Sequence, residues 1–226
     1  MVNHHPSDLL IMQFSAGQLP NALGIMVACH IENCTVCRQR GLHYESVGGE
    51  LLESVTPEPV DSGVLNRLLS ELDHPVAETA HSGAPAYLPT GANPQIPRPL
   101  QRFLTEVPAQ DAQWYESLPW SGFSQSIQEY LLPISDSQYT AKLYKIAAGK
   151  ELPEHTHRGN EYTLVMSGAF ADKSGDYRAG DFVLADQDTI HQPKAHQNKD
   201  CICFAVMDAP LKFTGFWGRM LNPFMR

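Results

Sequence analysis

The chain has 226 residues, 42% of them hydrophobic, which suffices for one large domain or two small ones with genuine cores. Its formal net charge of −9 argues against general binding to the nucleic-acid backbone or to anionic lipid. Residues 1–85 hold three basic and ten acidic side chains, a net charge of −7. Residues 1–20 lack the basic start and apolar run of a signal peptide, and the five cysteines are not spaced like a secreted disulfide framework. We therefore expect a cytoplasmic chain with reduced thiols and no membrane span.

The first part of the chain is predicted to be helical. Ser7 suits the cap of a short helix through Phe14. Pro20 fits the first turn of a second, apolar helix that runs towards His30. Asn33 suits the cap of a third helix, which would begin with two cysteines.

A further helix is predicted to open at Asp61 or Ser62 and to carry an apolar stripe. Leucines recur along it at i, i+3, i+4 and i+7, the spacing of one helix face: Leu65, Leu68, Leu69 and Leu72. Such a stripe can cover a core or fill the groove of a partner. Both interpretations stay open, because a region this small has little core left to fill.

His30, Cys34 and Cys37 follow the pattern H-x3-C-x2-C. Two cysteines three apart can turn both sulfurs to one side of a helix start, and a histidine one turn earlier reaches the same point. Thiolate and imidazole together suit zinc, which takes four ligands in structural sites. The neighbouring pair His4-His5 is the best local source of the fourth. The alternatives are a redox pair or two cysteines buried as small hydrophobes.

The composition changes between His74 and Pro99, where six prolines lie among Ala, Gly, Ser and Thr. This is typical of a semi-extended, mobile linker. Beyond it, short strand-like runs separated by Gly, Asp and Pro turns predict a sandwich or barrel: residues 125–132, 140–146, 162–165, 181–185 and 201–206. Short strands around a metal motif favour a double-sheet jelly roll.

A second metal motif, G-x5-H-x-H-x3-E-x6-G, contains His155, His157 and Glu161. Residues two apart on a strand point to one face, so the two histidines converge on the interior. Glu161 opens the next strand after a short turn and reaches the same point. The pattern is similar to the first signature of the cupin superfamily at every fixed position.

The second cupin signature is looser in this chain. It reads Gly180-Asp181 and then Asp186-Gln187-Asp188, where a Pro-x-Gly is usual, and it offers His191 as the fourth ligand. Three imidazoles and one carboxylate can hold zinc, iron, manganese, nickel or copper. With zinc the four ligands could close the shell, whereas iron or manganese would keep open positions.

Cys201 and Cys203 lie two apart on the last long predicted strand and therefore share a face. If that face is inward, both lie near the cupin metal and are candidate redox residues or extra ligands. The alternative is a pair of buried cysteines that pack as small apolar groups.

Taken together, these features resemble the ChrR family of zinc-binding anti-sigma factors. The resemblance extends from the His4-His5-x-Ser-Asp start through both ligand motifs to residues 200–203 and the Asp208-Ala209-Pro210-Leu211 that follows. It implies that His5, the second leading histidine, completes the N-terminal zinc site, with His4 as the open alternative. It also implies sequestration of an extracytoplasmic-function sigma factor, with a cupin needed to answer singlet oxygen or organic hydroperoxides.

We therefore expect two domains, all-α followed by all-β: a small zinc-binding helical bundle (residues 1–73), a Pro/Ala-rich linker (74–99) and a cupin, a double-stranded jelly-roll barrel (100–226). The expected ligands are His5, His30, Cys34 and Cys37 for the N-terminal zinc, and His155, His157, Glu161 and His191 for a cupin metal that is zinc or another divalent transition metal. Residues 1–72 would grip the sigma factor, with the leucine stripe in contact, while the cupin hangs on the mobile linker. Neither direct nucleic-acid binding nor membrane binding is expected.

The runner-up is a cupin metalloenzyme of the dioxygenase type with an accessory zinc domain. The acidic helical module and its leucine stripe favour the inhibitor, because a sigma factor is basic and an enzyme needs neither feature. No phosphate loop, nucleophile elbow or pair of catalytic carboxylates is present in the sequence. A DNA-binding activator is disfavoured by the acidic charge.

Overall fold

The computed structural model describes residues 2–61, 63–72, 96–105, 107, 111 and 113–213. Helices fill the first part of this range and come before the strands: α1 (Asp8–Ser15), α2 (Asn21–Asn33), α3 (Thr35–Glu53), α4 (Gly63–Leu72), α5 (Arg98–Gln101) and the 3-10 turn η1 (Trp114–Ser117). Among these helices there is none whose length and apolar character would let it cross a membrane.

The ends of two helices test the predicted caps. Ser7 caps α1 as predicted, since its Oγ accepts a hydrogen bond from Leu10 N. The prediction that Asn33 caps the third helix is wrong. Asn33 is the last residue of α2, its Nδ2 donates to Cys29 O, and Cys34 takes the cap position of α3 without a side-chain hydrogen bond. Both cysteines still lie at the beginning of that helix.

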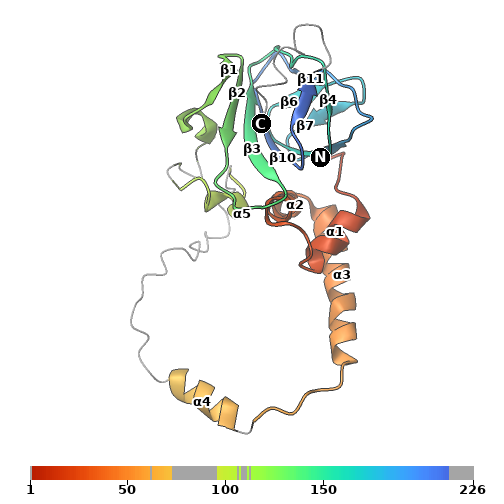
Figure 1. Cartoon of the computed structure of the whole chain (residues 1–226), viewed down its shortest axis with the longest axis vertical. Helices are drawn as coiled ribbons and strands as arrows, with labels where there is room; N and C mark the ends of the chain where they lie inside the picture. Colours follow the sequence, from red (N-terminus) through yellow and green to blue (C-terminus); the bar gives the residue numbers. More distant parts are fainter. Residues whose placement is uncertain are drawn as a thin grey trace.

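The strands form an antiparallel cupin fold, which confirms the predicted fold class (Figure 1). A six-stranded sheet has the order β1-β2-β3-β10-β5-β8, and β11-β4 and β7-β6-β9 form shorter sheets. Their bounds are β1 Ser121–Ser124, β2 Ile127–Leu131, β3 Thr140–Ile146, β4 His155–His157, β5 Glu161–Ser167, β6 Ala169–Ala171, β7 Asp176–Arg178, β8 Phe182–Ala185, β9 Lys194–Ala195, β10 Cys201–Met207 and β11 Leu211–Phe213.

Both faces of the large sheet are covered by other parts of the chain, as the burial of β10 shows. All seven of its residues are buried. Ile202, Phe204 and Val206 belong to a core shared with the helices, whereas Cys201 and Cys203 belong to a second core with residues of β6, β7 and β9. Alternate residues of a strand face opposite sides, so the sheet is a wall between a helical layer and the barrel interior.

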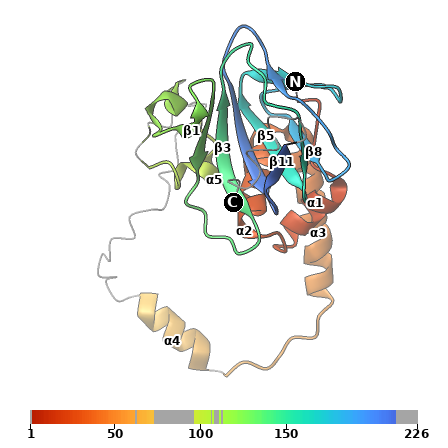
Figure 2. The ribbon, with the colours of Figure 1, turned by 45° about the horizontal axis from the view of Figure 1, so that its top comes forward.

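Helix α2 supplies the helical layer. It is apolar around most of its circumference, with Leu23, Ile25, Met26 and Val27 all buried, and it packs against β5 and β10 (Figure 2). Its first turn is tied to the cupin, because Asp136 Oδ2 accepts a hydrogen bond from Ala22 N at 2.9 Å. A carboxylate at a helix N-terminus also interacts favourably with the helix dipole.

This packing corrects the expectation that the cupin merely hangs on a tether. A helix that is apolar on nearly all sides needs cover on more than one side, and the cupin sheet supplies it. Most of the predicted linker lies outside the described residues. At its end, Ile96 is fully buried in the shared core, and α5 begins at Arg98, inside the segment assigned to the linker.

We predict that Met26→Ala destabilises the cupin as well as the helices. Met26 is fully buried in the shared core, and removal of such a side chain costs about 2–5 kcal/mol of unfolding free energy. All three tryptophans follow residue 100, so their fluorescence during urea unfolding reports on the cupin side. The control, Met12→Ala, alters a side chain that is 43% exposed and should cost about 0.5 kcal/mol or less. An unchanged tryptophan transition in Met26→Ala would show that the helices and cupin unfold separately.

Candidate metal centres

Four ligand atoms gather where the N-terminal segment, α2 and α3 meet. His5 Nδ1 lies 3.4 Å from both Cys34 Sγ and Cys37 Sγ, and His30 Nε2 lies 3.3 Å from Cys37 Sγ. All four atoms lie within 4.8 Å of one another. A tetrahedral zinc with ordinary bond lengths would put neighbouring ligand atoms roughly 3.5 Å apart. The structure thus brings together the four residues expected for the first site, and His4 lies outside the group.

The protonation states in this group also fit a cation. His30 Nδ1 donates to Gly180 O at 2.9 Å, since a carbonyl can only accept, so the lone pair of Nε2 faces Cys37. Burial lowers the pKa of His30 to about 4, and the ring is neutral at pH 7. Burial, together with the neighbouring Cys34, raises the pKa of Cys37 to about 12. A thiolate here therefore requires a metal, and two thiolates would neutralise a divalent ion.

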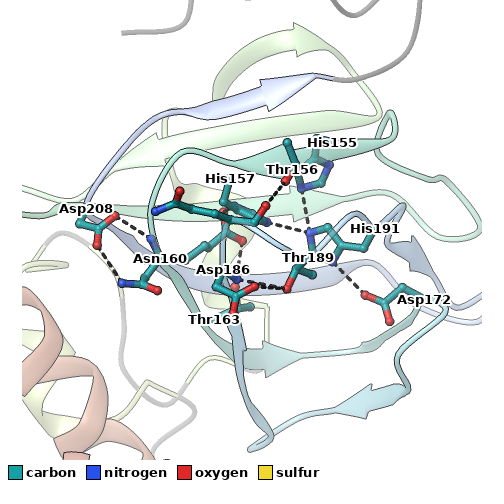
Figure 3. Close-up of polar contacts among 12 residues, drawn as sticks. His155, Thr156, His157, Asn160, Thr163, Asp172, Asp186, Thr189, His191 and Asp208 are labelled. Atoms are coloured by element: carbon teal, nitrogen blue, oxygen red, sulfur yellow. Dashed lines mark hydrogen bonds and ion pairs between the residues drawn. The ribbon is translucent and has the colours of Figure 1, made fainter.

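The second group consists of three imidazoles that point the same ring nitrogen at one another (Figure 3). His191 Nε2 lies 3.0 Å from His155 Nε2 and 3.1 Å from His157 Nε2. His155 and His157 come from β4, and His191 bridges to His155 through its backbone. The three side chains are buried, and burial lowers the pKa of His155 to about 4 and that of His157 to about 3.

In two of these rings, the hydrogen bond made by Nδ1 determines the protonation state of Nε2. His155 Nδ1 donates to Pro153 O at 2.8 Å, and His191 Nδ1 donates to Asp172 Oδ2 at 2.9 Å. Their Nε2 atoms are then unprotonated acceptors facing each other, an arrangement that repels unless a cation lies between them. Histidines that bind a metal usually donate the N–H of their second ring nitrogen to a carboxylate or a backbone carbonyl. These residues fit a divalent metal, which would supply positive charge and polarise a bound small molecule.

Glu161 lies at the border of this group. It is the first residue of β5, its Oε1 accepts from Thr163 Oγ1, and its Oε2 lies 3.8 Å from His157 Nδ1. Oε2 is buried without a hydrogen-bond partner, and burial raises the pKa of the carboxyl to about 7. An orphaned oxygen beside three imidazoles fits a ligand, but it is not among the atoms that converge. Its ligation stays a prediction.

A small cavity of about 40 Å³ adjoins two of the three histidines, His155 and His191. Cys203 lines it together with His155, His191 and Glu161. Cys201 Sγ lies 3.6 Å from Cys203 Sγ, so the two cysteines share a face, and both are buried. The hydrogen bond with Cys201, followed by burial, raises the pKa of Cys203, which holds it as a thiol.

Two cupin carboxylates that act on these groups were not predicted from the sequence. Asp172 stands in the turn after β6 and holds His191, and Asp181 precedes β8 and accepts from the N-terminal segment. In the sequence Asp172 looks like an ordinary turn residue, since aspartate is common in turns, and Asp181 stands out only as part of the loose second cupin signature. Only their partners, His191 and Asn3, reveal a role, and these lie far away along the chain.

The leucine stripe lies on α4, apart from the cupin and the other helices (Figure 1). Gly63 N donates to Asp61 Oδ1, which agrees with an opening at Asp61. The four leucines are each at least half exposed: Leu65 63%, Leu68 55%, Leu69 52% and Leu72 78%. Of the two interpretations of the stripe, a core face is therefore not supported by the described residues.

Comparison with known proteins places the whole chain beside one kind of regulator. A family model described as the ChrR cupin-like domain matches residues 109–209. The anti-sigma-E factor ChrR of Cereibacter sphaeroides is 35% identical over 225 residues, which cover 100% of this chain and 99% of that protein. The solved complex of Rhodobacter sphaeroides SigE with the anti-sigma ChrR matches 92% of this chain and 100% of that chain, at 32% identity and a TM-score of 0.76.

More distant likenesses concern the barrel alone. The solved acetylacetone dioxygenase of Acinetobacter johnsonii covers 44% of this chain and 74% of that chain, at 17% identity and a TM-score of 0.37. A likeness of this size says nothing about activity.

We predict two metal ions per chain, one in each group. Elemental analysis of protein purified without added metal should find both. Cys37→Ser and His191→Ala should each lose one ion, because each removes a ligand from a different group. His43→Ala alters an exposed histidine of α3 and should keep both ions. One ion in the unaltered protein, or the same loss in both ligand variants, would contradict two separate sites.

Proposed function

Because the chain belongs to the ChrR family of anti-sigma factors, we propose that it sequesters an extracytoplasmic-function sigma factor and releases it under oxidative stress. The observation that carries the proposal is the match to an anti-sigma factor solved in complex with its sigma factor, which extends over 92% of this chain. Both candidate groups of metal ligands, the one before residue 38 and the one in the cupin, belong to this chain. The N-terminal metal would be zinc with a structural role, and the chain would work in the cytoplasm.

The sigma factor would bind the helical part, with α4 in contact. Helix α4 presents a row of exposed leucines, and the chain before residue 86 carries a net charge of −7. An amphipathic helix can lay such a face into an apolar groove, while acidic charge attracts a basic partner and speeds its association. Leu65, Leu68, Leu69 and Leu72 are the proposed contacts.

The N-terminal zinc would hold the helices in the geometry that the sigma factor recognises. Its four candidate ligands come from the N-terminal segment, from α2 and from α3. The local core around them is small, since among the described residues only Ile11, Cys34 and Cys37 are buried in it. Few apolar contacts join these elements, so a metal would supply much of the energy that holds them together.

The cupin would sense the oxidant, singlet oxygen or an organic hydroperoxide. It holds the second metal group, and Cys203 lines the cavity beside two of its histidines. As a buried thiol, Cys203 is a poor nucleophile, so oxidation near the metal, rather than direct attack by the free thiol, would start the response. Cys201 is close enough to take part in a subsequent thiol reaction.

The geometry gives less support to a dioxygenase. A cavity of about 40 Å³ has room for a few water-sized molecules but not for an organic substrate of several carbon atoms. The enzyme alternative also assigns no role to the exposed stripe of α4. We therefore propose that the chain is not an enzyme.

We predict that Leu69→Ala weakens sigma-factor binding. The loss of one buried leucine contact costs about 1.5–3 kcal/mol, which is about tenfold or more in Kd. The measurement is titration calorimetry with an extracytoplasmic-function sigma factor that co-purifies with the chain from its own cells. Ser70→Ala changes the far side of the same helix and should keep full affinity. If both variants bind like the unaltered protein, α4 is not the contact.

We predict that His155→Ala represses at all times. Without its metal group the cupin should no longer answer the oxidant, while the helical part should still bind the sigma factor. A sigma-dependent reporter, measured with and without photo-oxidative stress, gives both properties, and His43→Ala should respond normally. A reporter that still rises under stress in His155→Ala would exclude the cupin metal from sensing.

A further inference from the structure

Residues 180–182, which lead into β8, contact the N-terminal metal group or the segment just before it. Gly180 O accepts the hydrogen bond from the ligand His30, and Phe182 places its ring against the same imidazole at 6.0 Å between centroids. Between them, Asp181 turns its carboxylate to the N-terminal segment. The cupin therefore supplies contacts to a metal site whose ligands all lie before residue 38.

Asp181 makes the most of these contacts. Its Oδ1 accepts from Asn3 N at 2.7 Å and His4 N at 3.1 Å, its Oδ2 accepts from Arg178 N at 2.9 Å, and His4 Nδ1 lies 3.4 Å from Oδ2. The side chain of Asp181 is only 1% exposed. Burial alone would raise its pKa, but these hydrogen bonds outweigh burial and hold the pKa below its usual range.

The backbone beyond Asp181 completes the attachment. Phe182 N donates to His4 O at 3.0 Å, so the segment is held from both sides of His4. Gly180 has a positive φ of 95°, and a Cβ there would lie 2.8 Å from Val2 Cγ2. The positive φ favours glycine at position 180, and the side chain of Val2 lies close to it. The next residue after this attachment is His5.

We propose that Asp181 is a positioning residue for the N-terminal metal site: it holds the segment Asn3–His4 so that the ring of His5 stays against Cys34 and Cys37. A segment that is not held in place samples many conformations, and fixing it costs conformational entropy each time the metal binds. Because Asp181 holds the segment in place before the metal binds, metal binding no longer carries this entropic cost. The cupin then takes part in metal binding at a site to which it gives no ligand.

This inference rests on the N-terminal metal site proposed above. The experiment uses the full chain and cobalt(II) as the probe. Cobalt bound to thiolates gives a charge-transfer absorption that a site of histidines alone does not give, so the titration reports only on the group that contains Cys34 and Cys37. Competition with zinc then gives the relative zinc affinity. Metal binding by His155, His157 and His191 serves as a check that the cupin is folded.

Two variants remove the same contact from opposite sides. Asp181→Asn replaces one carboxylate oxygen with a donor, and Asn3→Pro removes the backbone N–H that donates to Asp181 without any change to the cupin. Both should bind at the thiolate site about tenfold more weakly, the lower end of the range for residues that orient metal ligands. Asp200→Asn is the matched control, since Asp200 accepts from Ala148 N elsewhere in the cupin. Its affinity should not change.

Each outcome decides between the claims. No thiolate absorption in the unaltered protein would sink the metal site itself, and with it this inference. If the unaltered protein binds cobalt there and Asn3→Pro binds it equally tightly, Asp181 does not act through the segment and the inference is wrong, whatever Asp181→Asn shows. Should Asp181→Asn fail to fold, Asn3→Pro alone decides. Weak binding by Asn3→Pro with a normal Asp200→Asn supports the inference.

Discussion

The structure depends on covering helix α2. Its apolar residues point in nearly every direction, and a helix of this kind needs more cover than α1 and α3 alone provide. The six-stranded cupin sheet provides the missing cover, with Asp136 bound to the first turn of the helix and Gly180 O bound to His30 near its last turn. Attachment at both ends fixes where the N-terminal helices lie. The first metal group is thereby placed against the cupin.

The large sheet then acts as a wall shared by two chemical environments. One side of β10 faces the core that contains α2, and the other places Cys203 at the cavity beside His155 and His191. Strand β8 serves both sides as well: Phe182 touches His30, whereas Val183 and Ala185 line the cavity, and Ala185 pairs with Glu161. A displacement of this short strand would be felt at both metal groups. This continuity would give the proposed response to an oxidant a physical route from the cupin to the helices.

The sequence alone was sufficient to predict those parts of the candidate sites that depend on short spacings between residues. The ligand patterns around His30 and His155 work because residues three, four or two apart meet on a helix or a strand, and the structure brings most of them together. It was insufficient where the partner lies far along the chain. An apolar helix shows that it is buried but not against what, and an aspartate such as Asp181 shows no sign that it will bind residue 3. The cap predicted at Asn33 failed for a local reason, because α2 continues through it.

The candidate N-terminal metal site and the cupin form one structural unit. Hydrogen exchange at the amide of Phe182, which donates to His4 O, tests it most directly. We predict that Cys37→Ser, which removes a ligand from the site, speeds exchange at Phe182 while the amide of Val165, bonded to Asp181 O within the cupin, keeps its protection. Equal protection of Phe182 in the variant and the unaltered protein would show instead that the metal site and the cupin are independent.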